Sequence, residues 1–541
     1  MFRGQSFIKG AVILTLAGLF VRVLGAGLRI FLAAVMGDEG IGLYQMAYPI
    51  YATLLSISTA GIPIAISKLV AENVAFKDHR GAQKIFNISF VILTFLGALF
   101  SLVLYFGAEF FAQNIVKEPR AYYPLVCISP AILFVTMLSA FRGYFQGFQA
   151  MLPTAVSQII EQCGRVVVII VLVFLLLPRG LEFAAAGAAF GAVAGSFLGL
   201  LFLLFLYFRN RRKYIQKIKK QVVRRDFGIG ETIYRILALS IPITLGSLVI
   251  PVVNMIDLSV VPLRLHQVGY STKEATALYG QLTGMANSII QFPLILTIAL
   301  AMSLVPAISE AQTLRNDLLV KNRTELAMRF TLFFSIPASF GLYVLAKPTT
   351  IVLFENAPAA YPLAMMSFGL IFMSLYIATS GILQGLGYVL EPVKYMVFGT
   401  IIKFVLSWYW TADPRLHIGG AALATVASFF IASLLNIRKV SKITGWRFNF
   451  NELLFKPLVA ASFMAWSVHL AYGTIAGGFL PLFSARLAQA LSLLLSILIG
   501  LFIFVLVMFL VRAVRKEDLE AVPHIGPHLV KLTRKLNLLG R

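Results

Sequence analysis

Long apolar stretches alternate with short polar ones along the whole chain. Segments such as 166–177 and 198–208 contain no charged residue. A bilayer core about 30 Å thick needs roughly 20 apolar residues per helix, and only helices or closed barrels satisfy the backbone in lipid. These runs are too long and too continuously apolar for the alternating strands of a barrel. The pattern therefore predicts an all-α integral membrane protein.

The same stretches predict about fourteen membrane-spanning helices. Their approximate bounds are 7–35, 42–70, 85–108, 121–145, 153–177, 183–208, 233–262, 274–306, 326–346, 361–384, 393–411, 418–436, 457–476 and 483–512. Lys and Arg concentrate in the loops that follow the even-numbered helices, whereas the turn after the first, Gly37-Asp38-Glu39-Gly40, is acidic. Because cytoplasmic loops are enriched in cations, the charges predict that both termini are cytoplasmic.

Two parts of the chain repeat one another. Gly143-Tyr-Phe-Gln-Gly147 corresponds to Gly381-Ile-Leu-Gln-Gly385 at an offset of 238, and Ala65-Ile-Ser67 corresponds to Ala307-Ile-Ser309 at an offset of 242. Each copy has six helices, so both copies begin on the same side of the membrane. This predicts two lobes related by an axis along the membrane normal, with substrate between them. The predicted parts are an N-terminal lobe (1–208), a basic cytoplasmic linker (209–232), a C-terminal lobe (233–436), two further helices (437–512) and a basic cytoplasmic tail (513–541).

Composition agrees with a membrane protein. Of 541 residues, 59% are hydrophobic and 13% are charged, and the formal net charge is +24. The cations lie in loops, which favours membrane topology over nucleic-acid binding. The first apolar run is too long for a cleavable signal and lacks a small-residue cleavage pattern. Leucines among the cations of the tail are typical of an interfacial helix or, equally, of a solvated tail.

Motifs for other chemistry are absent from the sequence. The chain has no phosphate-binding loop of the Walker type, no His-Glu-x-x-His motif, and no metal spacing around Cys127 and Cys163. Its loops are too short for a catalytic domain. We therefore predict a protein that is not an enzyme and has no cofactor, apart from a candidate coupling ion, Na⁺ or H⁺.

Two arginines in the first predicted helix are the main candidates for substrate binding. Arg22 lies near its middle, and Arg29 follows seven residues later on the same helical face. A charge in hydrocarbon costs about 3 kcal/mol, so each is a functional candidate. Two guanidinium groups in line suit a diphosphate, because each can bind phosphate oxygens in bidentate fashion. The alternative is that each arginine pairs with a carboxylate or a backbone carbonyl.

Four further charges lie within predicted helices. Glu161 and Arg165 have the i, i+4 spacing of an intrahelical ion pair, which favours a structural role. Asp257 and Lys403 are a lone acid and a lone base, so they are candidates for a neutralising pair. Alternatively, Asp257 binds a coupling proton or sodium ion. Lys403 falls within one residue of the repeat position of Arg165.

The residues of the first two predicted helices resemble a known family. The segments 20–29, 36–44 and 60–72 are similar to stage V sporulation protein B, in the MurJ and polysaccharide-exporter branch of the multidrug/oligosaccharidyl-lipid/polysaccharide (MOP) flippase superfamily. The resemblance implies a two-lobe bundle like that of MurJ and of the multidrug exporters called MATE. It also implies transport of lipid II, the undecaprenyl-pyrophosphate-linked peptidoglycan precursor, by alternating access, and for sporulation members a role in the spore cortex.

The resemblance assigns substrate binding to Arg22 and Arg29. Similar flippases also use arginines in helices 2 and 8, which this chain lacks, so Arg165, Arg264 or Lys403 is a candidate replacement. Family members with a sodium site use acids in helices 7 and 11. Asp257 matches the first, and Lys403 stands in place of the second.

The leading interpretation is a bacterial cell-membrane flippase for a lipid-linked oligosaccharide. Its expected partners are this substrate, membrane lipid and peptidoglycan-synthesis enzymes. The alternatives are an exporter of another lipid-linked polysaccharide and a cation-coupled multidrug exporter, against which Arg22 and Arg29 argue because such exporters prefer cationic drugs. A membrane glycosyltransferase needs larger outer loops, and a scaffold needs no arginines at this depth.

Overall fold

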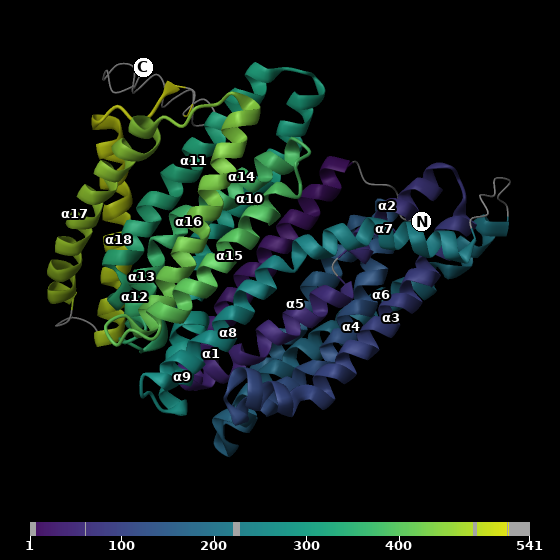
Figure 1. The fold of residues 1–541 in the computed structure, drawn as a ribbon, viewed down its shortest axis with the longest axis horizontal. Helices are drawn as coiled ribbons and strands as arrows, with labels where there is room; N and C mark the ends of the chain where they lie inside the picture. The colour runs from purple at the N-terminus through teal and green to yellow at the C-terminus, as the bar shows by residue number, and fades with distance from the viewer. Residues whose placement is uncertain (1–6, 60, 220–227, 480–483, 517, 519–541) are drawn as a thin grey trace. The chain divides into compact units, whose positions relative to one another are not determined.

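The fold is described by a computed structural model that covers residues 7–59, 61–219, 228–479, 484–516 and 518 (Figure 1). All regular structure in these residues is helical, which confirms the predicted all-α class. The leucines of the tail, for which an interfacial helix and a solvated tail were equal alternatives, lie outside the described residues. The chain divides into two compact units, Met1–Gly280 and Gln281–Arg541, called unit 1 and unit 2 below. The lobe boundaries expected from the sequence stay a prediction.

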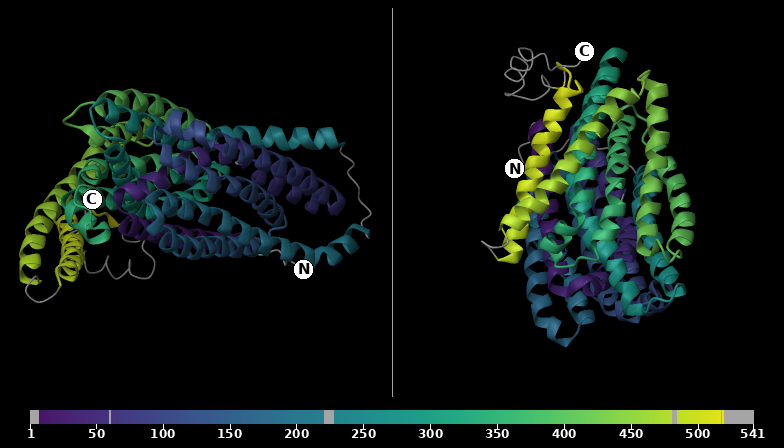
Figure 2. Two further views of the ribbon diagram at one scale, coloured as in Figure 1. Left: turned by 90° about the horizontal axis from the view of Figure 1, so that it is seen from below. Right: turned by 90° about the vertical axis from the view of Figure 1, so that its left-hand side faces the viewer.

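The described helices follow one another in chain order. In unit 1 they are α1 (Phe7–Thr59), α2 (Ile62–Ala75), α3 (His79–Phe110), η1 (Phe111–Val116), η2 (Pro119–Ala121), α4 (Tyr122–Gly147), α5 (Met151–Leu176), η3 (Leu177–Arg179), α6 (Leu181–Lys219), α7 (Ile229–Ser247), α8 (Val249–Gln267) and α9 (Thr272–Tyr279). η4 (Gly280–Ala286) leads into unit 2, where they are α10 (Asn287–Thr313), α11 (Asp317–Val344), α12 (Ala346–Phe354), α13 (Ala360–Ser367), α14 (Gly369–Gly385), α15 (Glu391–Trp410), α16 (His417–Thr444), η5 (Asn451–Phe455), α17 (Lys456–Phe479) and α18 (Ala485–Leu510). In Figure 2, α17 and α18 run side by side.

Many of these helices are long and apolar enough to cross a membrane. Eleven qualify among the described residues, or twelve if the pair α13 and α14, bent by 46°, forms one span. The predicted count of fourteen is not confirmed. Two features account for the difference. The run Ile13–Ala75 counts once although its 63 residues suffice for two crossings, and the 20-residue α15 is not among the eleven.

α1 is two helices joined at Gly37. This residue has a φ of 69°, a left-handed conformation that glycine adopts without the penalty of a Cβ atom. It stands at the start of the acidic turn expected after the first helix. The second helix was predicted over 42–70, and here the structure differs. The helix ends at Thr59 and α2 begins at Ile62, with a proline in its first turn. Gly61 fits this break because a Cβ atom there would lie 2.0 Å from the Ser240 carbonyl oxygen of α7.

The structure confirms the internal repeat in the contacts of its glycines. In unit 1, a Cβ atom on Gly147 of α4 would lie 2.7 Å from Val70 Cβ of α2. In unit 2, a Cβ atom on Gly385 of α14 would lie 2.9 Å from Ile308 Cβ of α10. Gly147 and Gly385 are 238 residues apart, and so are Val70 and Ile308. Glycines spaced by four let helix backbones approach closely in membranes, so each unit uses the same device at equivalent positions.

The same offset recurs in the loops. Lys77 and Arg315 both have positive φ values, and each is followed by a side chain that caps the next helix, Asp78 in one case and Asn316 in the other. The match of Ala65-Ile-Ser67 to 307–309, at an offset of 242, is therefore wrong by one helical turn. Short strings of small and apolar residues recur by chance, whereas helix contacts fix the register.

Candidate functional site

Three charged residues of unit 1 form a chain of ion pairs between α4 and α5. The Glu161 carboxylate accepts from Arg165 Nη2 at 3.0 Å and from Arg142 Nη2 at 2.8 Å. Arg142 Nε also donates to Ser157 Oγ at 3.0 Å. Between 15% and 20% of each of the three side chains is exposed. Two arginines share one carboxylate, so this group, the Arg142–Glu161–Arg165 triad, keeps a positive charge.

Packing against α6 holds the triad in place. A Cβ atom on Gly195 of α6 would lie 2.5 Å from the Glu161 carbonyl oxygen and 2.9 Å from Arg165 Cβ. No larger residue fits there, so α6 lies directly against the backbone of α5. The i, i+4 spacing that predicted the Glu161–Arg165 pair then brings the two side chains together on one face of α5. The expected pair is confirmed, and Arg142 is an addition to it.

Tyrosines from the second half of α1 lie next to the triad. The Tyr44 and Tyr48 rings are 5.2 Å apart, and those of Tyr48 and Tyr51 are 5.8 Å apart. Arg165 lies within electrostatic range of all three phenol groups, and Arg29 lies within electrostatic range of Tyr44. Arg29 and Arg165 therefore act on a common environment although they belong to different helices.

The first half of α1 also lies against α5. A Cβ atom on Gly25 would be 3.5 Å from the Gln162 amide nitrogen. Arg22 lies one turn before Gly25 and is exposed, and Arg29 lies one turn after it and is half-buried. Neither arginine forms a hydrogen bond or an ion pair with another described residue. The alternative of a structural pair with a carboxylate is thus not seen in the part of the chain that the structure describes.

The remaining predicted site residues lie elsewhere. Arg264 is in the last turn of α8, where its side chain donates to Gln267, and it is not among the described partners of the triad. Asp257 is buried in the middle of α8, in unit 1. Lys403 is buried on α15, in unit 2. Because Asp257 and Lys403 belong to different units, their pairing stays a prediction.

The register of the repeat makes Lys403 the counterpart of Arg165. Both positions are related by the offset of 238 that relates the glycine contacts. The counterpart of Glu161 is Gly399, where a Cβ atom would lie 2.7 Å from the Ser428 carbonyl oxygen of α16. Unit 2 therefore repeats the cation of unit 1 without the carboxylate four residues before it.

Two further ion-pair groups were not predicted. In unit 1, Arg120 bridges Glu39 at 2.6 Å and Glu118 at 2.9 Å, and Thr276 Oγ1 of α9 donates to Glu118 at 2.9 Å. Burial would raise the pKa of the Glu118 carboxyl, but hydrogen bonds from Arg120 and Thr276 outweigh it and hold the pKa below its usual value. The group fastens the Gly37 turn of α1 to the start of α4 and to α9.

The second group is in unit 2. Arg329 of α11 is 2% exposed and pairs with Asp518 at 2.5 Å and with Glu452 of η5 at 3.4 Å. Arg515 completes the group through Glu452, at 3.1 Å, and Glu325. The segment that follows α18 is thereby fastened onto α11. Among the described residues, no group of three or more His, Cys, Asp or Glu side chains suits a metal ion.

Comparison with known proteins places the chain in a family. Residues 7–312 match the family described as polysaccharide biosynthesis protein. The chain belongs to this family. It is 31% identical to stage V sporulation protein B of Bacillus subtilis (strain 168) over 531 residues, which are 97% of this chain and 99% of that protein. It is 26% identical to the lipid II flippase MurJ of the same organism, over 92% and 94% of the two chains.

Solved structures show the fold of this family member. Lipid II flippase MurJ in an inward closed conformation matches with a TM-score of 0.68 at 17% identity, over 92% of this chain and 98% of that one. An inward-facing multidrug resistance MATE transporter of the MOP superfamily matches with a TM-score of 0.65 at 15% identity, over 79% and 94%. The chain is therefore a multi-pass membrane protein with the transporter fold of the MOP superfamily.

Proposed function

We propose that the chain is a flippase and not an enzyme. It moves an undecaprenyl-pyrophosphate-linked sugar across a bacterial membrane by alternating access. The proposed substrate is lipid II. The names of two relatives support lipid II as the substrate, since one is named a lipid II flippase and the other a stage V sporulation protein. The second name also supports a role in making spore-cortex peptidoglycan, with peptidoglycan-synthesis enzymes as partners.

The observation that carries the proposal is the excess of arginine on the helices of unit 1. Among the described residues, Glu161 pairs with Arg142 and Arg165, whereas Arg22 and Arg29 pair with no carboxylate. A lipid-linked sugar of this class carries two phosphates, and burying them in a bilayer is costly without cations. Guanidinium groups bind phosphate oxygens in bidentate fashion, so unpaired arginines on α1 lower that cost.

An exporter of another lipid-linked polysaccharide is the second candidate. The family description, polysaccharide biosynthesis protein, favours it, and the same arginines serve any diphosphate-linked sugar. A multidrug exporter shares the fold but prefers cationic drugs, which the arginines would repel.

Coupling to an ion is part of the proposal. Asp257 is a buried acid in α8, and we propose that it binds a coupling Na⁺ or H⁺ unless the fixed charge of Lys403 replaces the ion. Titration of sodium against the thermal unfolding of the purified chain separates these cases. A sodium-specific shift that Asp257→Asn removes supports ion binding, and the lack of any shift in the unsubstituted chain favours the fixed charge.

The deciding experiment is rescue of a bacterium depleted of its own lipid II flippase. The unsubstituted chain, Arg22→Ala and Arg165→Ala are compared at matched membrane levels, with the exposed Arg211→Ala as the control. We expect rescue by the unsubstituted chain and the control, and failure of the other two. Rescue by all four proteins would mean that Arg22 and Arg165 have a structural role and are not needed for transport. Failure of all four proteins at good expression would favour another lipid-linked polysaccharide as the substrate. Reporter fusions to each end of the chain test the proposal that both termini are cytoplasmic.

A further inference from the structure

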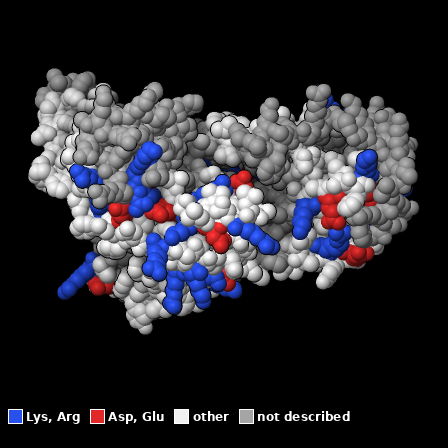
Figure 3. All heavy atoms as spheres, turned by 90° about the horizontal axis from the view of Figure 1, so that it is seen from above, with Lys and Arg blue, Asp and Glu red and all other residues white. Residues whose placement is uncertain are grey.

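Unit 2 contains a recess whose lining is rich in positive charge. It has a volume of about 720 Å³ and is lined by Lys321, Glu325, Gly445, Trp446, Arg447, Asn449 and Arg515. Figure 3 looks onto a face of the molecule where Lys and Arg side chains gather, with fewer Asp and Glu among them. The recess is separate from the Arg142–Glu161–Arg165 triad, which belongs to unit 1.

The charges of this recess are not balanced. Its one carboxylate, Glu325, pairs with Arg515, and Arg515 also pairs with Glu452 at 3.1 Å. Lys321 and Arg447 are exposed and form no hydrogen bond or ion pair with another described residue. Two cations are therefore available to a ligand, and the ligand that complements them is an anion.

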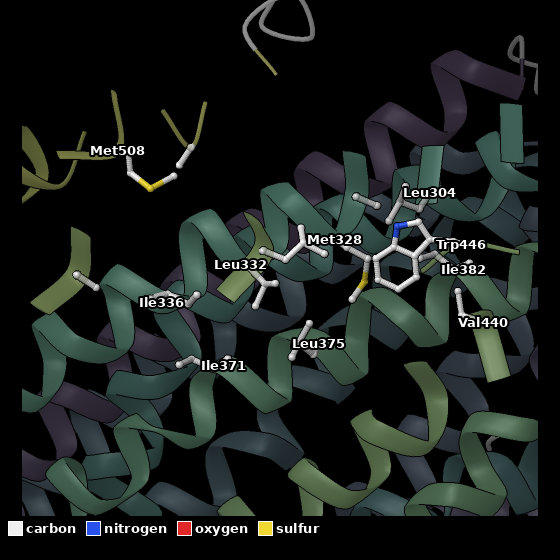
Figure 4. Close-up of a cluster of buried hydrophobic side chains, with 14 of the residues drawn as sticks. Leu304, Met328, Leu332, Ile336, Ile371, Leu375, Ile382, Val440, Trp446 and Met508 are labelled. Atoms are coloured by element: carbon white, nitrogen blue, oxygen red, sulfur yellow. The ribbon is translucent and has the colours of Figure 1, made fainter. Parts of the chain in front are cut away.

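The walls of the recess are held in place from behind. Trp446 is 1% exposed and packs in the unit 2 core with Met328, Leu304 and Ile382, as Figure 4 shows. Its backbone N–H donates to Thr444 Oγ1 at 3.2 Å. The neighbouring Arg447 is thus carried by an anchored backbone. Arg515, which also lines the recess, is held by its two carboxylate partners, Glu325 and Glu452.

The position of the recess identifies the source of the anion. It lies near the ends of four candidate membrane spans, namely Asp317–Val344, His417–Thr444, Asn451–Phe479 and Ala485–Leu510. Large apolar side chains flank its lining along the chain and are exposed, among them Leu318 at 68% and Phe450 at 61%. Cations beside exposed apolar side chains at the end of a span are the pattern that meets a lipid headgroup and its acyl chains.

We propose that this recess binds the phosphate headgroup of an anionic membrane phospholipid, with Lys321 and Arg447 as the groups that contact the phosphate. Leu318 and Phe450 then lie against the acyl chains. The bound lipid would hold the start of α11 to the segments that follow α16 and α18. This proposal concerns a resident lipid and does not depend on which substrate the protein carries.

The test is lipid binding to the full chain, purified in a neutral detergent and measured by native mass spectrometry. The probe is short-chain phosphatidylglycerol, with phosphatidylcholine and inorganic phosphate as comparisons. Lys321→Gln combined with Arg447→Gln is expected to weaken phosphatidylglycerol binding about 25-fold, since each cation near an anionic lipid contributes roughly fivefold. Binding should also weaken as salt is raised.

The matched control is Arg438→Gln combined with Lys442→Gln, which removes the same charge from exposed positions of α16 outside the recess. An equal loss in this control would overturn the proposal in favour of diffuse attraction. Equal binding of phosphatidylcholine, or full competition by inorganic phosphate, would also overturn it, the latter in favour of a free anion site. If the double variant fails to fold, Arg447→Gln alone is expected to lose about fivefold, and the charge-preserving Arg447→Lys to keep most of the binding.

Discussion

At the scale of single residues, the triad depends on the one carboxylate that its two arginines share. We expect Glu161→Gln to destabilise the chain by about 2 kcal/mol, because it leaves Arg142 and Arg165 close together without a counter-charge. The measurement is the free energy of unfolding in detergent. Glu231→Gln is the control, since Glu231 is exposed and has no described partner. Equal stability of the two variants would contradict a structural contribution from the triad.

Glu118 gives a residue-scale prediction for pH. Its pKa is lowered in the folded protein, so its contribution to stability is complete above the ordinary value of about 4.5 and is lost as pH falls through the folded-state pKa. Thermal unfolding should therefore show Glu118→Gln to be less stable than the unsubstituted chain at pH 7. This gap should narrow in acid, below about pH 4.5. A gap that stays constant down to pH 3 would show that the carboxylate charge is not its source.

At the scale of helices, the close approach of α4 to α2 relies on glycine. A Cβ atom on Gly143 would lie 2.6 Å from the Pro63 carbonyl oxygen, whereas on the equivalent Gly381 the nearest carbonyl oxygen, that of Ala301, would be 3.1 Å away. We expect Gly143→Ala to cost about 2 kcal/mol and Gly381→Ala less, because the first forces a backbone apart and the second needs a shift of a few tenths of an ångström.

The control for the glycine pair is Gly473→Ala in α17, where an added Cβ atom meets nothing within 4 Å. That variant should unfold at the same temperature as the unsubstituted chain or slightly above it, since alanine favours helix. Unfolding midpoints that rank Gly381→Ala below Gly143→Ala would contradict the packing argument.

At the scale of the whole molecule, the sequence predicted what depends on composition and local spacing. Apolar runs predicted the helical class, the i, i+4 spacing predicted the Glu161–Arg165 pair, and the repeated glycines predicted two related halves. What it missed depends on contacts between distant segments. Arg142 was not among the predicted site residues, because nothing in its own helix points to Glu161. Arg329 and Asp518 are 189 residues apart, so neither residue indicates the other.

The Arg329 group ties the segment after the last helix to α11, beside the apolar packing of α17 and α18 on the same unit. Arg329 is buried and donates to Asp518 and, at 2.7 Å, to the Ala513 carbonyl oxygen, so it fastens the segment after α18 onto α11. Removing one member of a buried ion pair costs about 3 to 5 kcal/mol because its partner stays buried with an unbalanced charge. We expect a loss of this size from Arg329→Met, measured as the free energy of unfolding in detergent.

The matched control lies in the same unit. Arg486 pairs with Glu355 while 59% and 66% of their side chains are exposed, so Arg486→Met should cost less than about 1 kcal/mol. A double-mutant cycle of Arg329→Met with Asp518→Asn tests the contact itself, and a coupling energy near zero would contradict it. Limited proteolysis adds a readout of position, because loss of the tie should expose the segment around Arg515 to trypsin before α11 unfolds. If trypsin cleaves this segment at the same rate in the Arg329→Met variant as in the unsubstituted chain, other contacts hold α17 and α18 in place.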